Sequence, residues 1–155
     1  MNISQHSKSR GLTLVEVVIA TSIILVSVLA LLSVHSLYLR TALSNTDKAK
    51  ATYLAEESLE VVRFWRDSSW NNKLAPIALN TAYGVVINGN AWATSTNQWV
   101  GSFERSITLS AVYRNASGDI VSSGGTLDTN TRLVLSQVSW AKGGATTTKS
   151  LSTYL

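Results

Sequence analysis

The chain has 155 residues, a formal net charge of +4 at pH 7 and no cysteine. The absence of cysteine excludes an intrachain disulfide, so an exported domain would depend on its core alone. The charge is too small to indicate nucleic-acid binding by itself, and the length allows one anchored helix and one domain.

The chain begins with a polar segment that leads into a long apolar run. Lys8 and Arg10 come immediately before this run, which extends from Leu12 to Leu37 and has Glu16 and His35 as its only ionisable side chains. About 20 apolar residues cross the hydrocarbon core of a membrane, so the run predicts a spanning helix. Because positive residues stay on the cytoplasmic side, we expect the later residues to lie outside the cytoplasm.

A carboxylate in such a run needs an explanation, because an acidic residue at the centre of a membrane helix costs about 2.5 to 3.5 kcal/mol on insertion scales. One interpretation is that Glu16 lies near the cytoplasmic end and reaches polar headgroups. The other is that it neutralises a positive charge in an assembly of helices, since a buried charge is costly until it is paired.

The sequence Gly11-Leu-Thr-Leu-Val-Glu16 has a glycine directly before the apolar run and a carboxylate five positions later. This arrangement resembles the type IV prepilin leader, or class III signal peptide. The resemblance implies that prepilin peptidase cuts between Gly11 and Leu12, that Leu12 is then N-methylated, and that Glu16 sets the register between subunits. Residues 1–11, with Lys8 and Arg10, would be the cleavable leader, and the partners would be other pilin or pseudopilin subunits and the cytoplasmic membrane.

An amphipathic segment follows the apolar run over residues 38–70. Its less polar residues recur at spacings of three and four, as on one face of a helix; they are Ala51, Leu54, Ala55, Ser58, Val61, Val62 and Trp65. Neither proline nor glycine occurs between Leu12 and Trp70. We therefore expect one helix from Leu12 to near Asp67, roughly 80 Å long at 1.5 Å per residue.

A long helix of this kind resembles the pilin fold, in which the distal half packs on an antiparallel sheet. The segment from Tyr53 to Asp67 and the ending Ser150-Leu-Ser-Thr-Tyr-Leu155 are similar to segments of minor-pilin-like proteins. The expected fold is α+β: a membrane and assembly helix over residues 12–37, its amphipathic continuation over 38–70, and a β domain over 71–155. Many major pilins carry proline or glycine midway along the membrane helix, whereas Ser27 to Ser36 contains neither.

The β domain is predicted from alternating runs at Tyr83 to Ile87, Gln98 to Arg114, Thr131 to Trp140 and Thr146 to Leu155. In the second run, alternate residues share one face that we expect to lie on the helix; they are Phe103, Ile107, Leu109, Ala111 and Tyr113. The alternation shifts in the third run, which predicts a β-bulge near Ser136.

The sequence does not indicate an enzyme. Glu56, Glu57 and Glu60 lie close to Arg63 and Arg66, but their spacing is typical of charges on a helix surface. The chain contains no nucleophile and base set, cofactor motif or metal-ligand spacing, and its two histidines lie at His6 and His35. Asn115-Ala-Ser117 fits a glycosylation sequon, and its modification is left open.

Basic and aromatic residues raise a second class of function, a surface that binds DNA or a carbohydrate; they are Trp92, Trp99, Trp140, Arg105, Arg114, Arg132, Lys142 and Lys149. Two hypotheses therefore remain. The favoured one is a minor pilin or pseudopilin of a type IV pilus or a related secretion or competence filament. The alternative is a membrane-tethered adhesin or DNA-binding module.

Overall fold

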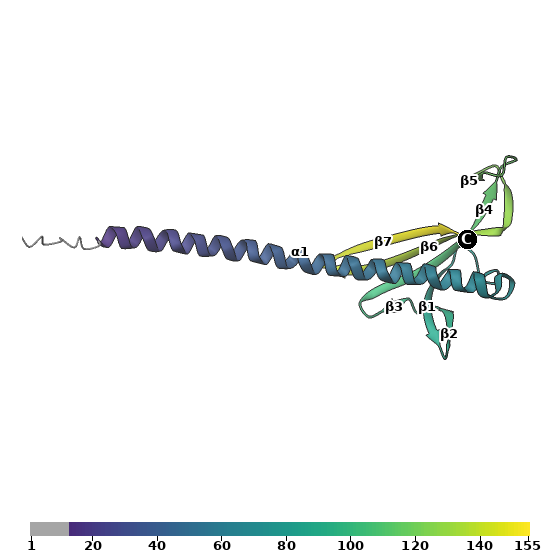
Figure 1. Cartoon of the computed structure of the whole chain (residues 1–155), viewed down its shortest axis with the longest axis horizontal. Helices are drawn as coiled ribbons and strands as arrows, with labels where there is room; N and C mark the ends of the chain where they lie inside the picture. Colours follow the sequence, from purple (N-terminus) through teal and green to yellow (C-terminus); the bar gives the residue numbers. More distant parts are fainter. Residues whose placement is uncertain (1–12) are drawn as a thin grey trace, which may run out of the picture. The chain divides into compact units, whose positions relative to one another are not determined.

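The computed structural model describes residues 13–155, which divide into one compact unit ending at Asn45 and a second from Thr46 to Leu155 (Figure 1). Helix α1 extends from Leu14 to Ser69, and one π-helical segment, η1, follows from Trp70 to Leu74. The expected single helix is confirmed, and it begins and ends within two residues of the predicted bounds. The α+β, pilin-like arrangement is confirmed as well.

The first unit consists of the beginning of α1. Its hydroxyl side chains are satisfied by the helix itself, because they donate to carbonyl oxygens one turn earlier. Thr21 donates to Val17 at 2.9 Å, and Ser27 donates to Ile23 at 2.8 Å. The hydroxyl groups of Thr21 and Ser27 are therefore hydrogen-bonded within the helix, and the helix stays regular at these positions.

In the second unit, α1 presents the predicted face to the core; the buried residues are Ala51, Ala55, Ser58, Leu59, Val61, Val62 and Trp65. The chain stays helical beyond the predicted end near Asp67. The hydroxyl of Ser69 accepts a hydrogen bond from the Asn72 amide, and η1 continues as far as the fully buried Leu74. Burial of Leu74 supplies the apolar contact that keeps this extra turn ordered.

The sheet of the described residues has seven strands, and every pairing is antiparallel. Its main order is β2-β1-β4-β6-β7, with β3 and β5 paired to β4. The four predicted runs are found, but two short strands were missed and the second run is divided by a turn at Gly101. The bounds are β1 Ala82–Asn88, β2 Ala91–Ser95, β3 Trp99–Val100, β4 Phe103–Arg114, β5 Ile120–Val121, β6 Thr126–Lys142 and β7 Ala145–Tyr154.

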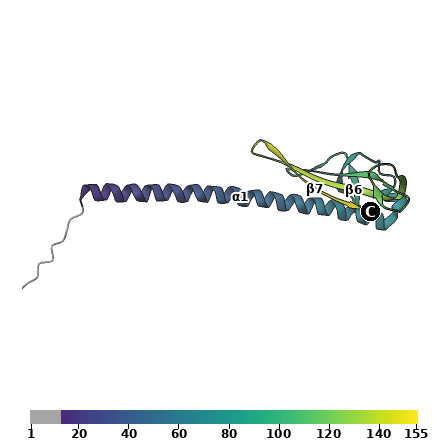
Figure 2. The same ribbon diagram turned by 90° about the horizontal axis from the view of Figure 1, so that it is seen from above.

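Strands β6 and β7 lie beside the part of α1 that belongs to the second unit (Figure 2). The core lies between this part of α1 and the sheet. One cluster joins Val62 and Trp65 of the helix to Ile107 and Leu109 of β4. A second cluster joins Ala51 and Ala55 to Phe103, Val138 and Trp140.

The predicted bulge at Ser136 is wrong. Strand β6 keeps regular alternation, and Ser136 itself is buried between Val134 and Val138. The register shift lies instead between Ala111 and Val112 of β4, which pair with Arg132 and Asp128 of β6.

That register shift changes which side of β4 faces the core. Val112 is buried, whereas Tyr113 is 41% exposed, so the prediction that Tyr113 lies on the core face is also wrong. Between these two pairings β6 has three residues, Thr129 to Thr131, and β4 has none, so the alternation of β4 is interrupted there.

Candidate processing and assembly site

The predicted processing residues Lys8, Arg10, Gly11 and Leu12 lie outside the described residues. Glu16 is described, in the first turn of α1. Cleavage between Gly11 and Leu12 and methylation of Leu12 therefore stay predictions, and the geometry of the site is that of Thr13 and Glu16.

Thr13 and Glu16 form a reciprocal pair of hydrogen bonds at the start of α1. The Glu16 amide donates to the Thr13 hydroxyl at 3.3 Å, and the Thr13 amide donates to the Glu16 carboxylate at 3.4 Å. This pattern is a capping box, in which two side chains satisfy backbone donors that a helix leaves unpaired. The carboxylate also lies at the positive end of the helix dipole, which stabilises a negative charge.

Beyond this cap, the first unit has an apolar surface without a core of its own. Large side chains on every side of the helix are exposed; for example, Leu14 is 83% exposed and Leu31 is 70% exposed. Such a helix is typical of one that lies in lipid or among other helices. By length and composition, the helix is able to cross a membrane. His35 is exposed on this same stretch of helix.

The acidic cluster of the second unit is a set of surface ion pairs and one buried contact. Glu60 pairs with Arg63 one turn later, as expected from the spacing. Glu57 reaches Arg105 of β4, whose side chain is 5% exposed. Arg105 also donates to the Val85 carbonyl at 2.5 Å, so it joins α1, β4 and β1. In residues 13–155, no group of histidine, aspartate and glutamate side chains is suited to hold a metal ion.

The basic and aromatic residues do not form one surface. Arg105 and Trp140 belong to the interior, while Trp99 is 60% exposed. Lys142 pairs with Asp47 at 2.6 Å, and the Arg132 guanidinium lies 5.6 Å from the centre of the Trp70 ring. Arg105 alternates with Phe103 and Ile107, which is a pattern typical of a buried position, although it is one of the residues of the predicted DNA- or carbohydrate-binding surface.

A polar cluster around Asp128 holds the bulged end of the sheet. The Thr131 hydroxyl donates to the Asp128 carboxylate at 2.6 Å, the Arg114 side chain at 2.7 Å, and the Asn130 amide at 2.9 Å. These hydrogen bonds, with that of Thr131 contributing most, lower the pKa of Asp128 to about 2.

Asn115, the residue of the sequon, is part of a tight turn beside this cluster. Its side-chain oxygen accepts hydrogen bonds from the Ser117 and Asp119 amides, and its side-chain amide donates to Asp119. The side chain of Asn115 therefore shapes the turn, while its modification stays untested.

Residues 6–32 match the family model described as the prokaryotic N-terminal methylation motif. Comparison with curated proteins and with solved structures found no match. The matched range includes the predicted leader charges, Gly11, Leu12 and the Thr13 and Glu16 pair. The chain therefore carries the class III signal peptide of type IV pilins, and this motif supports a type IV pilin-like prepilin.

Proposed function

We propose that the chain is a minor pilin or pseudopilin, a structural subunit of a type IV pilus or of a related secretion or competence filament. The precursor is held in the cytoplasmic membrane by the apolar part of α1, with its β domain outside the cytoplasm. Prepilin peptidase removes residues 1–11, Leu12 is methylated, and the helix then moves from lipid into the filament. The observation that carries this proposal is the methylation motif over residues 6–32.

The exposed apolar side chains of the first unit support assembly through this helix. A surface of this kind is stable in lipid, and it is equally suited to packing against the same surface of neighbouring helices. The second unit has its own core, built from its part of α1 and the sheet, so it does not need the first unit to bury its apolar side chains.

Glu16 acts in two ways in this proposal. In the single chain, its carboxylate accepts from the Thr13 amide and caps the helix. Cleavage before Leu12 creates a positive amine one residue before Thr13, and packing among other helices removes that amine from water. Glu16 of a neighbouring subunit then neutralises the amine, which sets the register between the two chains.

Processing is tested by the mass and N-terminal residue of the membrane-extracted protein, with and without co-expressed prepilin peptidase. We expect a start at methylated Leu12 only when the peptidase is present, and an unprocessed Gly11→Val control. A start at Met1 despite active peptidase would contradict the proposal. It would favour the alternative, a membrane-tethered adhesin or DNA-binding module.

The role of the Glu16 charge is tested by separating it from capping. Glu16→Gln keeps a side chain that serves in a capping box but removes the charge. Thr13→Ala removes the cap and keeps the charge. We expect Glu16→Gln subunits to be processed but to be lost from filaments, while Thr13→Ala subunits are incorporated; the reverse result would assign Glu16 to capping alone.

The DNA-binding alternative has weaker support because Arg105 and Trp140 are buried. Its direct test is binding of double-stranded DNA by the detergent-solubilised chain at several salt concentrations. Binding through phosphate contacts weakens steeply with salt. Absence of salt-sensitive binding at low ionic strength would remove this alternative.

A further inference from the structure

Strand β7 is the last strand of the main sheet, and β6 is its one strand partner among the described residues. The two strands pair in continuous register from Leu133 and Tyr154 to Lys142 and Ala145, without a bulge. The other long side of β7 is therefore a free edge.

The hydrogen bonds at the end of β7 show which backbone groups face this edge. Arg132 and Leu155 exchange both of their backbone hydrogen bonds, at 2.8 and 2.9 Å. In an antiparallel pair, such hydrogen-bonded positions alternate with positions whose N–H and C=O groups face away from the partner. Counting back along the unbroken register, the residues that face the free edge are Thr146, Thr148, Ser150, Ser152 and Tyr154.

This edge lacks the features that commonly block strand addition. Proteins protect sheet edges with proline, bulges, several charges or a covering segment. β7 contains no proline, and Lys149 is its only charged residue. Residues Ala145 to Ser150 are all exposed, and no backbone hydrogen bond joins the outward groups to another element of the described part of the chain. The many threonines favour an extended backbone.

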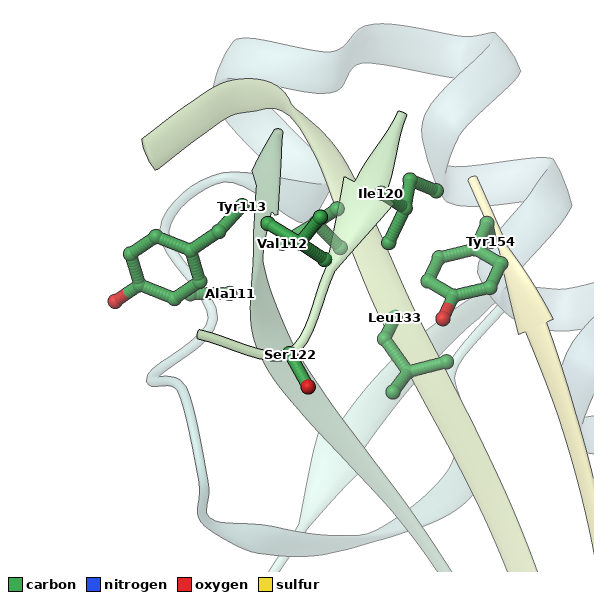
Figure 3. Close-up of a pocket in the computed structure, with 8 residues that line it drawn as sticks. Ala111, Val112, Tyr113, Ile120, Ser122, Leu133 and Tyr154 are labelled. Atoms are coloured by element: carbon green, nitrogen blue, oxygen red, sulfur yellow. The ribbon is translucent and has the colours of Figure 1, made fainter. Parts of the chain in front are cut away.

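A hollow of about 530 Å³ lies beside the Tyr154 end of β7, on the side opposite the free edge. Figure 3 shows Tyr154 of β7, Leu133 of β6 and Ile120 of β5 around it, with the Ser122 hydroxyl at its margin. Most of the side chains that line it are apolar or aromatic, as in sites that accept an apolar group. Among these lining residues Tyr154 alone comes from β7, so the hollow lies on the side of β7 that faces β6 and β4 and is not part of the free edge.

Lys149 gives the edge a charge preference. Within residues 13–155 no ion pair is found for Lys149, and β7 contains no acidic residue of its own. A second β7 would bring another lysine and no carboxylate, so a different segment with an acidic residue is the better match. Opposite charges on neighbouring strands stabilise their pairing, and like charges destabilise it.

We propose that the free edge of β7 binds an extended segment of a different polypeptide, which adds to the sheet as a strand. The backbone of that segment pairs with the five outward residues, and a carboxylate of the segment faces Lys149. Main-chain hydrogen bonds then give affinity, while the lysine gives specificity.

The probe for this test is a synthetic, end-capped peptide of alternating threonine and valine with one central glutamate. Its binding to the full chain in detergent micelles is measured by fluorescence anisotropy. We expect saturable binding that Ser152→Pro weakens by about tenfold or more, because the outward N–H is lost and the ring blocks the edge. Ser152→Ala is the matched control, and it keeps the amide and the affinity. Lys149→Gln is expected to weaken binding by a smaller factor.

A second probe keeps the test decisive if Ser152→Pro perturbs the fold. The same peptide with alternate backbone amides N-methylated loses its hydrogen bonds without any change in the protein, and we expect it not to bind. Equal binding of both peptides, or no saturable binding to the wild type, would overturn the proposal. Self-association of the wild type that Ser152→Pro abolishes would overturn it in favour of a second copy. The measurement uses unprocessed protein, so its outcome is independent of cleavage at Gly11 and of filament assembly.

Discussion

The two units of this chain treat apolar side chains in opposite ways. Leu31 in the first unit is 70% exposed, whereas Leu109 in the second is completely buried. Both are leucines in regular secondary structure, so neither residue type nor local conformation explains the difference. The second unit brings a helix face and a sheet face together, while the first has no second layer within the described residues.

This contrast assigns different environments to the two units. The apolar side chains of the first unit are not buried within the chain, so lipid or other helices are needed to remove them from water. Burial of apolar area gives a favourable free energy wherever the area is removed from water. The second unit gains that free energy by folding. Under the proposed function, assembly depends on the first part of α1 and folding depends on the second.

The largest predicted effect comes from removing the first unit. A chain that begins at Thr46 lacks the apolar surface and keeps both core clusters. We expect it to leave the membrane fraction and to unfold cooperatively in urea, as measured by fractionation and tryptophan fluorescence. All five tryptophans lie after Thr46, so fluorescence reports this unit. Loss of cooperative unfolding would show that the β domain depends on the first unit.

A matched pair of leucines tests the contrast directly. Leu109→Ala leaves a cavity in the core and is expected to lower the free energy of unfolding by about 2 to 5 kcal/mol. Leu31→Ala removes an exposed side chain of the first unit and is expected to leave the same transition unchanged. Both variants are measured in detergent micelles by urea titration with tryptophan fluorescence. Equal effects would refute the separation of the two units.

The ion pair between Glu57 and Arg105 tests how the helix is held on the sheet. Glu57→Gln leaves a buried guanidinium without its counter-charge, and we expect a loss of about 1.5 to 3 kcal/mol in unfolding free energy. Glu56→Gln, on the exposed side of the helix, is the control. Adding Arg105→Met to Glu57→Gln is expected to recover part of the loss, because the unpaired charge is removed. A double variant less stable than Glu57→Gln would contradict this account.

The sequence predicted the helix and the main strands because these depend on local patterns. The absence of proline and glycine and the spacing of Ala51, Ala55 and Val62 were sufficient for α1. Thr13 and Glu16 also have the local spacing of a capping box, but this cap was not predicted. Strand β5 has two residues, too few to show an alternating pattern, and β2 has Trp92 as its one large apolar side chain.

The errors in the sheet arose where tertiary contacts decide the structure. Arg105 is buried because Glu57, distant in sequence, and the Val85 carbonyl both accept its hydrogen bonds. Ser136 interrupts an apolar pattern, which suggested a bulge, yet its small side chain lies in the core. Partners that are far away in sequence leave no local signal.

Ser58 and Ser136 are both fully buried, but only one of them has a hydrogen-bond partner for its hydroxyl among the described residues. The Ser58 hydroxyl donates to the Leu54 carbonyl at 2.9 Å, whereas the Ser136 hydroxyl has no hydrogen-bond partner among the described residues. We expect Ser136→Ala to raise the free energy of unfolding by up to about 1 kcal/mol, since an unsatisfied buried hydroxyl is removed. Ser58→Ala is expected to be neutral or destabilising in the same urea titration. Equal loss in both variants would imply that the Ser136 hydroxyl is satisfied in solution.

The smallest effect is a pH dependence that belongs to the second unit alone. The pKa of Asp128 is lowered from its ordinary value of 3.8 to about 2, chiefly by the Thr131 hydroxyl and then by Arg114. At pH values between these two, the unfolded chain binds a proton that the folded chain does not, so stability falls as the pH falls from about 4 to about 2. Asp128→Asn is expected to flatten this part of the curve, and Thr131→Val to shift it toward higher pH. Urea titrations between pH 2 and pH 5 measure both variants. If the dependence of unfolding free energy on pH were unchanged in Asp128→Asn, the acid sensitivity would belong to other carboxylates. If the wild-type dependence were also found in the chain beginning at Thr46, its origin would lie in the second unit.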